Sequence, residues 1–237
     1  MPQRLITIFS VVFFINLSIA RAETGKYRVM FGADPATEMT IGWEAISGGN
    51  HRVYYDTVDH GTDTSAYGFS ADPQVTHDYY GMKSQFAELT DLQPAAAYYF
   101  VVADDEGTGR ELWFLTASDN PTTPFSFIAG GDSRSNRSPR KQGNRLAAKL
   151  RPLFILFTGD FIANASSESQ WQNWLEDWQL TIAEDGRIIP IVPAQGNHEY
   201  TETVEKLFNT PQDVVYAQTF GGSLMRIYTL NTESGNV

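Results

Sequence analysis

The feature that most constrains the fold of this chain is a change of residue pattern near positions 118–124. Before it, short runs rich in Val, Ile, Tyr, Phe and Trp are separated by Gly, Asp and Pro clusters, which is typical of an all-β domain. After it, apolar runs alternate with stretches of helical periodicity, which is typical of an α/β domain. The segment between them is polar and contains Pro121 and Pro124, so it predicts a linker at 119–124. We therefore expect two domains, at 23–118 and 125–237.

The first domain is predicted to be a β-sandwich, because many short strands follow one another closely. Met39, Ile41 and Trp43 alternate with polar or small residues, which indicates a strand with one buried face. The candidate strands cover residues 27–31, 39–45, 52–56, 84–89, 98–103 and 111–116.

The second domain is predicted to alternate strands and helices. Trp171, Trp174 and Trp178 recur at helical spacing and indicate a helix face that packs in the core, whereas Glu176 and Asp177 on the same helix are expected to face solvent. The candidate strands cover 125–129, 153–157, 188–192 and 224–230, and the candidate helices cover 139–150, with Ser138 as N-cap, and 170–180.

A short motif follows each of the first three apolar runs in this domain. The motifs are Gly131-Asp132-Ser133-Arg134, Gly159-Asp160 and Gly196-Asn197-His198-Glu199. Parallel strands end at the same edge of a sheet, so these motifs can assemble a metal site from distant parts of the sequence. The alternative is structural: Asp132 would cap backbone amides in a turn, and the third motif would be a glycine turn into a helix with His198 as a surface cap.

The overall composition narrows the function. The formal net charge is −11, with 17 basic and 28 acidic residues, which argues against a basic nucleic-acid footprint. Cysteine is absent, which excludes thiolate ligands and a cysteine nucleophile. Of the four histidines, only His198 lies in a motif, and His51, His60 and His77 are expected on the surface of the sandwich.

Taken together, the three motifs resemble those of the calcineurin-like metallophosphoesterases, and within them the purple acid phosphatase branch. The resemblance implies a four-layer αββα catalytic domain and two metal ions, of iron, zinc or manganese. It assigns Asp132 to the first metal, Asp160 to a bridge between both metals and Asn197 to the second metal. His198 would contact the substrate phosphate and protonate the leaving oxygen. Arg134 replaces a histidine found in many members and is expected to bind the substrate phosphate.

Two departures from that family pattern are visible. Ala163 stands where purple acid phosphatases place a tyrosine, so their coloured tyrosine–iron bond is not expected. The family also supplies several histidine ligands from a later Gly-His-x-His-like segment, and no histidine follows His198 here. The sequence therefore predicts an incomplete catalytic domain that, as a truncated or fragmentary chain, binds metal poorly and turns over little or no substrate.

The first domain resembles a fibronectin type III domain. Leu92, Pro94 and Tyr98 resemble its turn and following strand, and Trp43 suits its buried tryptophan. Such a sandwich precedes the catalytic domain in many purple acid phosphatases.

The N-terminal residues are predicted to direct export. Arg4 is followed by an apolar stretch at 5–20, and Ala20 and Ala22 are the small residues that a signal peptidase reads. We expect residues 1–22 to be a signal peptide and the mature protein to be periplasmic or secreted, with no stable membrane span. The alternative is an uncleaved anchor, for which the apolar stretch is short.

The sequence thus favours an acid phosphatase-like hydrolase that cleaves phosphate esters with the help of metal ions. The alternative is a catalytically inactive remnant that acts as an extracytoplasmic binding module through its sandwich. The motifs do not distinguish between monoester, diester, nucleotide and phosphoprotein substrates, and they leave the oligomeric state open.

Overall fold

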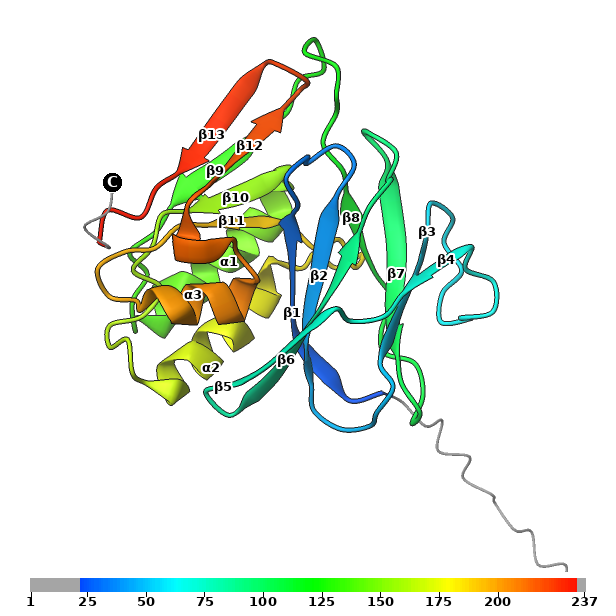
Figure 1. Cartoon of the computed structure of the whole chain (residues 1–237), viewed down its shortest axis with the longest axis horizontal. Coiled ribbons are helices and arrows are strands. Elements are labelled where there is room, and N and C mark those ends of the chain that lie inside the picture. The colour runs from blue at the N-terminus through cyan, green and yellow to red at the C-terminus, as the bar shows by residue number, and fades with distance from the viewer. Residues whose placement is uncertain (1–21, 234–237) are drawn as a thin grey trace, which may run out of the picture.

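The computed structural model describes residues 22–233. Strands β1 to β8 form an all-β domain, which lies beside an α/β unit built from the later part of the chain (Figure 1). The β domain consists of two antiparallel four-stranded sheets, ordered β1-β2-β6-β5 and β4-β3-β7-β8. The strands are β1 Thr24–Phe31, β2 Met39–Ala45, β3 Arg52–Asp56, β4 Phe69–Ala71, β5 Val75–Tyr79, β6 Met82–Leu89, β7 Ala97–Ala103 and β8 Leu112–Leu115.

Both faces of the β1-β2-β6-β5 sheet are covered. Ile41 and Trp43 point into the core between the two sheets, as their alternation predicts. On the opposite face, Met82 and Phe86 join the core of the α/β unit, and β1 contacts both β11 and α2. The prediction of one buried face was therefore incomplete, because the second domain packs against the face that was expected to be polar.

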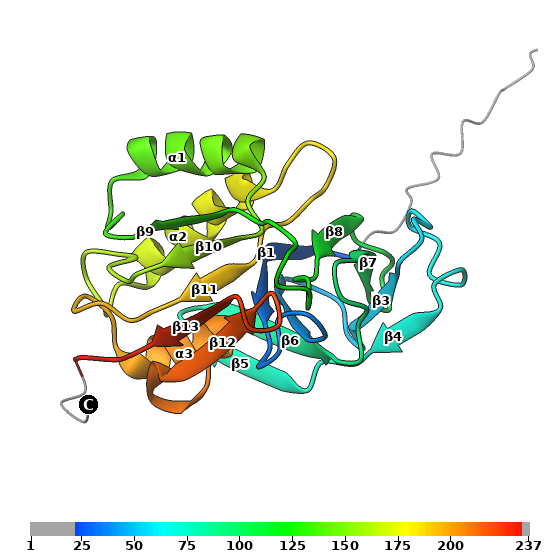
Figure 2. The same cartoon turned by 90° about the horizontal axis from the view of Figure 1, so that it is seen from above.

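The α/β unit is built on a parallel sheet of order β11-β10-β9. Helices α1, α2 and α3 lie on one side of this sheet and the β12–β13 hairpin lies on the other (Figures 1 and 2). Its elements are β9 Phe127–Gly130, α1 Arg137–Leu150, β10 Phe154–Phe157, α2 Glu168–Trp178, η1 Gln179–Thr181, β11 Ile191–Pro193, α3 Thr201–Phe208, η2 Gln212–Val214, β12 Tyr216–Phe220 and β13 Met225–Thr229.

The three tryptophans of α2 are core residues, as predicted. Trp171, Trp174 and Trp178 are each at most 1% exposed, and the rings of Trp174 and Trp178 stack 5.2 Å apart. Trp174 packs against Phe157 of β10 and against Phe161 in the loop after it, and Trp171 packs against Phe161.

Several local predictions were wrong. Asp177 does not face solvent: it is 1% exposed, because α1 covers it and Arg137 and Arg140 bind its carboxylate. Helix α1 begins earlier than predicted, with Asn136 rather than Ser138 at its N-cap position. The strand predicted at 125–129 begins two residues later, as β9, which is the edge strand of its sheet and leaves Phe127 41% exposed.

His51 was also misplaced by the sequence analysis. It is 4% exposed rather than on the surface, and its Nε2 lies 3.4 Å from a carboxylate oxygen of the equally buried Asp104. His60 and His77 are partly exposed residues of the β domain.

The predicted signal peptide, apart from Ala22, lies outside the described residues. None of the helices within residues 22–233 combines the length and the apolar character that crossing a membrane requires.

Candidate active site

The three motifs meet at the carboxyl edge of the parallel sheet, each in the loop that follows a strand. The loops after β9 and β10 are joined by backbone hydrogen bonds. The amide of Thr158 donates to Gly130 O at 2.9 Å, Asp132 N donates to Gly159 O at 2.9 Å, and Arg134 N donates to Asp160 O at 3.1 Å. The parallel register of β9 and β10 places these groups opposite each other, so the sheet itself positions the first two motifs.

The second and third loops touch through glycines. A Cβ atom on Gly159 would lie 2.2 Å from the amide nitrogen of Gly196, and one on Gly196 would lie 2.2 Å from Asp160 Oδ1. Gly159 also has a φ of +94°, which favours glycine. The glycines in these motifs are therefore required for close approach, and this brings the amide of His198 to 3.3 Å from Asp160 Oδ1.

Two carboxylates and one guanidinium form the charged part of the site. Arg134 donates from Nε to Asp132 Oδ1 at 2.5 Å and from Nη2 to Asp160 Oδ2 at 3.2 Å. The hydrogen bond to Asp132 raises the pKa of the Arg134 guanidinium, so this side chain is fully charged. All three residues have positive φ values, of 54° for Asp132, 40° for Arg134 and 53° for Asp160. Such conformations are uncommon outside glycine and concentrate at functional sites.

His198 is held by the second loop. Its Nδ1 donates to the carbonyl oxygen of Ala163 at 2.8 Å in the tautomer that this contact favours. With the proton on Nδ1, Nε2 is the ring atom that exchanges a proton with a ligand. Asn197, the preceding residue, is exposed at the same edge of the sheet.

Glu199 is a residue of the candidate site that the sequence analysis quoted but did not use. It is 5% exposed, and its carboxylate accepts hydrogen bonds from the amides of Asp160 at 2.9 Å, Phe161 at 2.8 Å and Gly196 at 2.9 Å. Burial raises the pKa of Glu199, and these backbone donors offset only part of that rise. Glu199 thus ties the second loop to the third. The only signal in the sequence was an acid next to His198.

Helices α1 and α2 support the loop that follows β9. Arg140 of α1 donates to the carbonyl oxygen of Arg134 and, at 2.7 Å, to the buried carboxylate of Asp177 on α2. Trp174 Nε1 donates to Ser133 Oγ at 3.0 Å, and that hydroxyl donates to Phe161 O at 3.2 Å. The loop that carries Asp132 and Arg134 is therefore anchored at two points.

The donor set can be compared with what a metal ion requires. The guanidinium of Arg134 pairs with both Asp132 and Asp160, so one positive charge lies within reach of both carboxylates. Carboxylate and amide oxygens are the donors that hard cations prefer. Within residues 22–233, however, no group of three or more His, Cys, Asp or Glu side chains is arranged to hold a metal ion. The site thus fits a cation but supplies only part of its coordination shell, and His51, His60 and His77 remain in the β domain.

Comparison with known proteins gives two family matches. Residues 26–117 match the model of the purple acid phosphatase N-terminal domain, and residues 138–233 match that of the calcineurin-like phosphoesterases. The second match includes Asp160, Asn197 and His198, whereas Asp132 and Arg134 precede it. No curated protein sequence matches the chain.

Two solved structures share the fold. The purple acid phosphatase PPD1 from yellow lupin (Lupinus luteus) seeds is 14% identical with a TM-score of 0.58, and the match covers 74% of this chain and 35% of the lupin chain. The structure of PhoD is 12% identical with a TM-score of 0.53, and the match covers 79% of this chain and 41% of PhoD. The chain thus spans less than half the length of either structure. The purple acid phosphatase N-terminal domain family thus matches residues 26–117, and the calcineurin-like phosphoesterase family matches residues 138–233, each over less than half of the chain.

Proposed function

We propose that this site hydrolyses phosphate esters with the help of bound metal ions. The observation that carries the proposal is the convergence of Asp132, Asp160 and His198 at one edge of the parallel sheet, in a chain whose residues 138–233 match the calcineurin-like phosphoesterases. The family match supports phosphoester hydrolysis in general. The dinuclear centre, the individual residue roles and the acid phosphatase-like activity are our proposals.

Asp132, Asp160 and Asn197 are the residues that would hold the metal ions, with Asp160 shared between two of them. Their oxygen donors suit iron, zinc or manganese when nitrogen ligands complete the shells. A bound cation would supply Lewis-acid polarisation of a phosphoryl oxygen. Because the described residues complete neither shell, we expect weak metal binding and slow turnover for this chain.

The remaining roles fall to two cationic or titratable side chains. Arg134, which is exposed and fully charged, can pair with two oxygens of a substrate phosphate. His198, oriented through Nδ1 by the carbonyl oxygen of Ala163, can transfer a proton to the leaving oxygen from Nε2.

The proposal also includes the domains that surround the site. We propose that residues 23–118 form a fibronectin type III-like sandwich, that 119–124 link it to the catalytic domain, and that 125–237 form the first part of a four-layer αββα domain. The two four-stranded sheets and the hydrogen bond from Gln93 N to the Tyr98 hydroxyl, 2.9 Å long, support the first of these assignments. We also propose that residues 1–22 direct export to the periplasm or the outside of the cell.

The test compares metal binding with hydrolysis in the same variants. Mn²⁺ and Zn²⁺ binding to the purified chain would be measured by calorimetry, and hydrolysis would be followed with p-nitrophenyl phosphate. We expect Asp160→Asn to abolish both. We expect His198→Ala to keep metal binding while lowering the rate by about 10²-fold or more.

His60→Ala is the matched control, because His60 is a partly exposed histidine of the β domain. It should leave both measurements unchanged. Hydrolysis that survives in Asp160→Asn, or a rate that falls equally in His60→Ala and His198→Ala, would contradict the proposed site.

A further inference from the structure

The charged part of the candidate active site contains its own cation. The Arg134 guanidinium lies between two carboxylates: its Nε donates to Asp132 Oδ1 at 2.5 Å, and its Nη2 donates to Asp160 Oδ2 at 3.2 Å. These are the same two carboxylates that the proposed function assigns to metal ions. A metal ion and Arg134 therefore need the same oxygen donors.

Asp160 is engaged by the protein through both of its oxygens. Its Oδ2 accepts from Arg134, and its Oδ1 accepts from the amide of His198 at 3.3 Å. A carboxylate that is shared between two cations uses both oxygens, so the oxygen held by Arg134 is needed as well. The amide of His198 is fixed by the close approach of Gly159 to Gly196, whereas the Arg134 side chain is 45% exposed. Of the two partners, Arg134 is the one that can leave.

Electrostatics also oppose the presence of both cations at these carboxylates. Arginine stays protonated in proteins, so unlike histidine it cannot lose its charge and become a metal ligand. Two cations that share carboxylate oxygens lie within a few ångström of each other, and like charges at such distances repel even near a protein surface. Movement of the Arg134 guanidinium away from Asp132 and Asp160 removes this repulsion.

The backbone of Arg134 is anchored, so only its side chain has to move. Its amide donates to Asp160 O at 3.1 Å, and its carbonyl oxygen accepts from the buried Arg140 of α1. Exposed ion pairs are individually weak, so rotation of the half-exposed side chain carries the guanidinium off the carboxylates with little loss of free energy. The anchored backbone keeps the released guanidinium beside the site.

We propose that Arg134 is a resident counter-cation that a metal ion displaces from Asp132 and Asp160, and that the released guanidinium then binds the substrate phosphate. The assignment rests on the proposed function, because it requires the two carboxylates to be metal ligands. It also sets an order of events. Without a metal ion, Arg134 is paired with acids and offers no free cation to a phosphate; with one, it does.

The first test follows Arg134 itself. Phenylglyoxal modifies unpaired arginines faster than paired ones, and peptide mass spectrometry would measure its rate at each arginine of the full chain. We expect Mn²⁺ to speed the modification of Arg134 severalfold, and inorganic phosphate added at constant free Mn²⁺ to slow it again. Arg145, an exposed arginine of α1 outside the site, should react at one rate throughout. Labelling of Arg134 that does not respond to saturating Mn²⁺ would overturn the proposal.

The second test measures Mn²⁺ affinity by calorimetry. Arg134→Gln should tighten Mn²⁺ binding by roughly tenfold, because two exposed ion pairs no longer compete with the metal ion. Arg134→Lys keeps the charge but lacks the planar fork that bridges both carboxylates, so its affinity should lie between those of wild type and Arg134→Gln. Arg145→Gln is the matched control, since it removes the same charge from an exposed position outside the site.

Binding of inorganic phosphate to the Mn²⁺-loaded protein should change in the opposite direction. Arg134→Gln removes the released guanidinium, so it should weaken phosphate binding while it tightens Mn²⁺ binding. A purely structural role of Arg134 would not move the two affinities in opposite directions. Circular dichroism would verify that the variants are folded.

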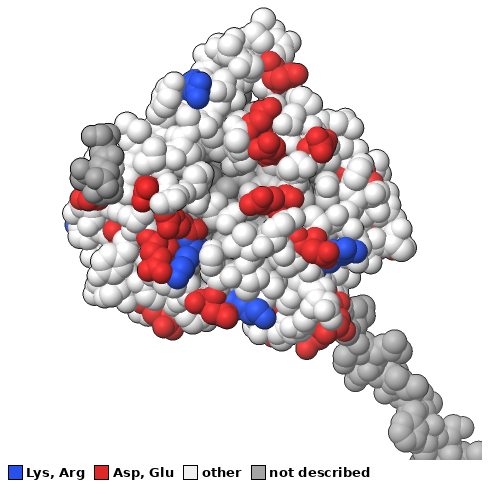
Figure 3. Space-filling view, viewed as in Figure 1, with Lys and Arg blue, Asp and Glu red and all other residues white. Residues whose placement is uncertain are grey.

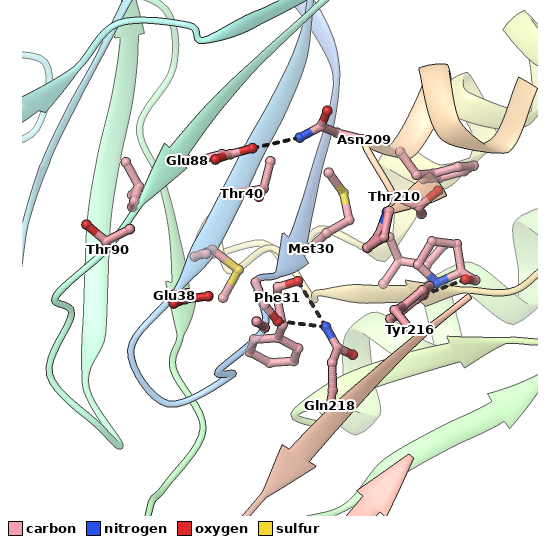
Figure 4. A pocket seen from close by; sticks show the side chains of 18 of the residues that line it. Met30, Phe31, Glu38, Thr40, Glu88, Thr90, Asn209, Thr210, Tyr216 and Gln218 are labelled. Atoms are coloured by element: carbon pink, nitrogen blue, oxygen red, sulfur yellow. Dashed lines mark hydrogen bonds between the residues drawn. The ribbon is translucent and has the colours of Figure 1, made fainter. Parts of the chain in front are cut away.

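Cation binding elsewhere on this acidic chain needs its own control. Acidic side chains are spread over the face drawn in Figure 3, and Glu38 and Glu88 line a cavity of about 500 Å³ between the domains (Figure 4). No residue of the candidate active site lines this cavity. Glu88→Gln keeps the acceptor oxygen for Asn209 Nδ2, which donates to Glu88 Oε1 at 3.1 Å, and it should leave Mn²⁺ affinity unchanged.

The outcomes separate this inference from the proposed function. Tighter Mn²⁺ binding and weaker phosphate binding in Arg134→Gln, with wild-type affinities in Arg145→Gln and Glu88→Gln, support the displacement. Equal Mn²⁺ affinity in wild type and Arg134→Gln, or the same gain in Arg145→Gln, would overturn the displacement and leave the proposed metal site intact. If neither wild type nor Arg134→Gln binds Mn²⁺, the proposed metal site fails and the displacement fails with it.

Discussion

At the scale of single residues, Glu199 is the side chain that keeps the proposed site together. Its carboxylate accepts from three backbone amides that belong to two separate loops. Glu199→Ala would leave those buried donors unpaired, at a cost of about 1–3 kcal/mol for each lost partner. We therefore expect the free energy of unfolding, measured by urea denaturation, to fall by at least about 2 kcal/mol.

A second variant separates this role from simple loss of volume. Glu199→Gln keeps one acceptor oxygen and should destabilise less than Glu199→Ala. Glu202→Ala, which removes an exposed glutamate of α3 that pairs with Lys206, should change the free energy of unfolding by less than about 1 kcal/mol. If Glu199→Ala is no more destabilising than Glu202→Ala, the two loops do not depend on Glu199.

The same contacts show which parts of the site could be predicted. The positions of Asp132, Asp160 and His198 after apolar strands were readable, because strand periodicity and the glycines are local in sequence. The burial of Glu199 was not, since its partners at Asp160 and Phe161 lie 39 and 38 residues away. The pairing of Arg134 with both aspartates likewise depends on how two loops meet.

At the scale of elements, the strongest periodic patterns were read correctly. Strands β2 and β3 have the predicted bounds. The missed elements are short or lack a distinct pattern: β4 has three residues, and β5 alternates between half-buried and exposed positions. Helix α3 has eight residues and begins just after the third motif. It was missed because the motif was interpreted as part of a metal site, and a glycine turn into a helix was considered only as the structural alternative. Such short elements are stabilised by contacts with neighbouring strands and helices, and these contacts cannot be read from a single sequence.

The α1–α2 pair gives a pH-dependent prediction. Burial alone would raise the pKa of Asp177, but hydrogen bonds from Arg137 and Arg140 outweigh it and hold that pKa below its ordinary value. A carboxyl with a lowered pKa in the folded state adds stability above the unfolded-state pKa and loses it as the pH falls through the folded-state value. Asp177→Asn should therefore cost about 3 kcal/mol at pH 7, because it leaves Arg140 buried without its counter-charge.

The measurement is the free energy of unfolding of both proteins between pH 7 and pH 3. The difference between wild type and Asp177→Asn should shrink as the pH falls below about 4, the ordinary pKa of aspartate. Glu176→Gln, one residue earlier on α2, removes an exposed partner of Arg137 and should cost less than about 1 kcal/mol. A cost for Asp177→Asn that is the same at every pH would refute the ionic origin.

At the scale of the whole molecule, the two domains are joined by hydrogen bonds at the edge of a sheet. Strand β1 is an edge strand, and its pairing with β2 shifts register between Gly25 and Arg28. Gln179, just after α2, pairs with the backbone of Tyr27 at this edge. It accepts from Tyr27 N at 3.0 Å and donates to Tyr27 O at 2.9 Å. One amide side chain thus pairs with the β-domain edge as a neighbouring strand would.

Gln179→Ala should therefore uncouple the domains. Removing these two hydrogen bonds to the Tyr27 backbone should lower the free energy of unfolding by about 1–3 kcal/mol and speed hydrogen exchange at the Tyr27 amide. Tryptophan fluorescence, which reports largely on Trp171, Trp174 and Trp178 of α2, should then change at a lower urea concentration than the far-ultraviolet circular dichroism signal of the β domain.

The control and the contrary outcome follow from the same geometry. Gln212→Ala removes an exposed glutamine in η2, away from β1, and should leave a single coincident transition. Buried Arg28 also crosses the interface, donating to Leu207 O at the end of α3. If Gln179→Ala leaves the transitions coincident and Tyr27 exchange unchanged, Arg28 and the apolar contacts of Met82 and Phe86 are sufficient to couple the domains. The hydrogen bonds between Gln179 and the edge of β1 would then not be needed to couple the domains.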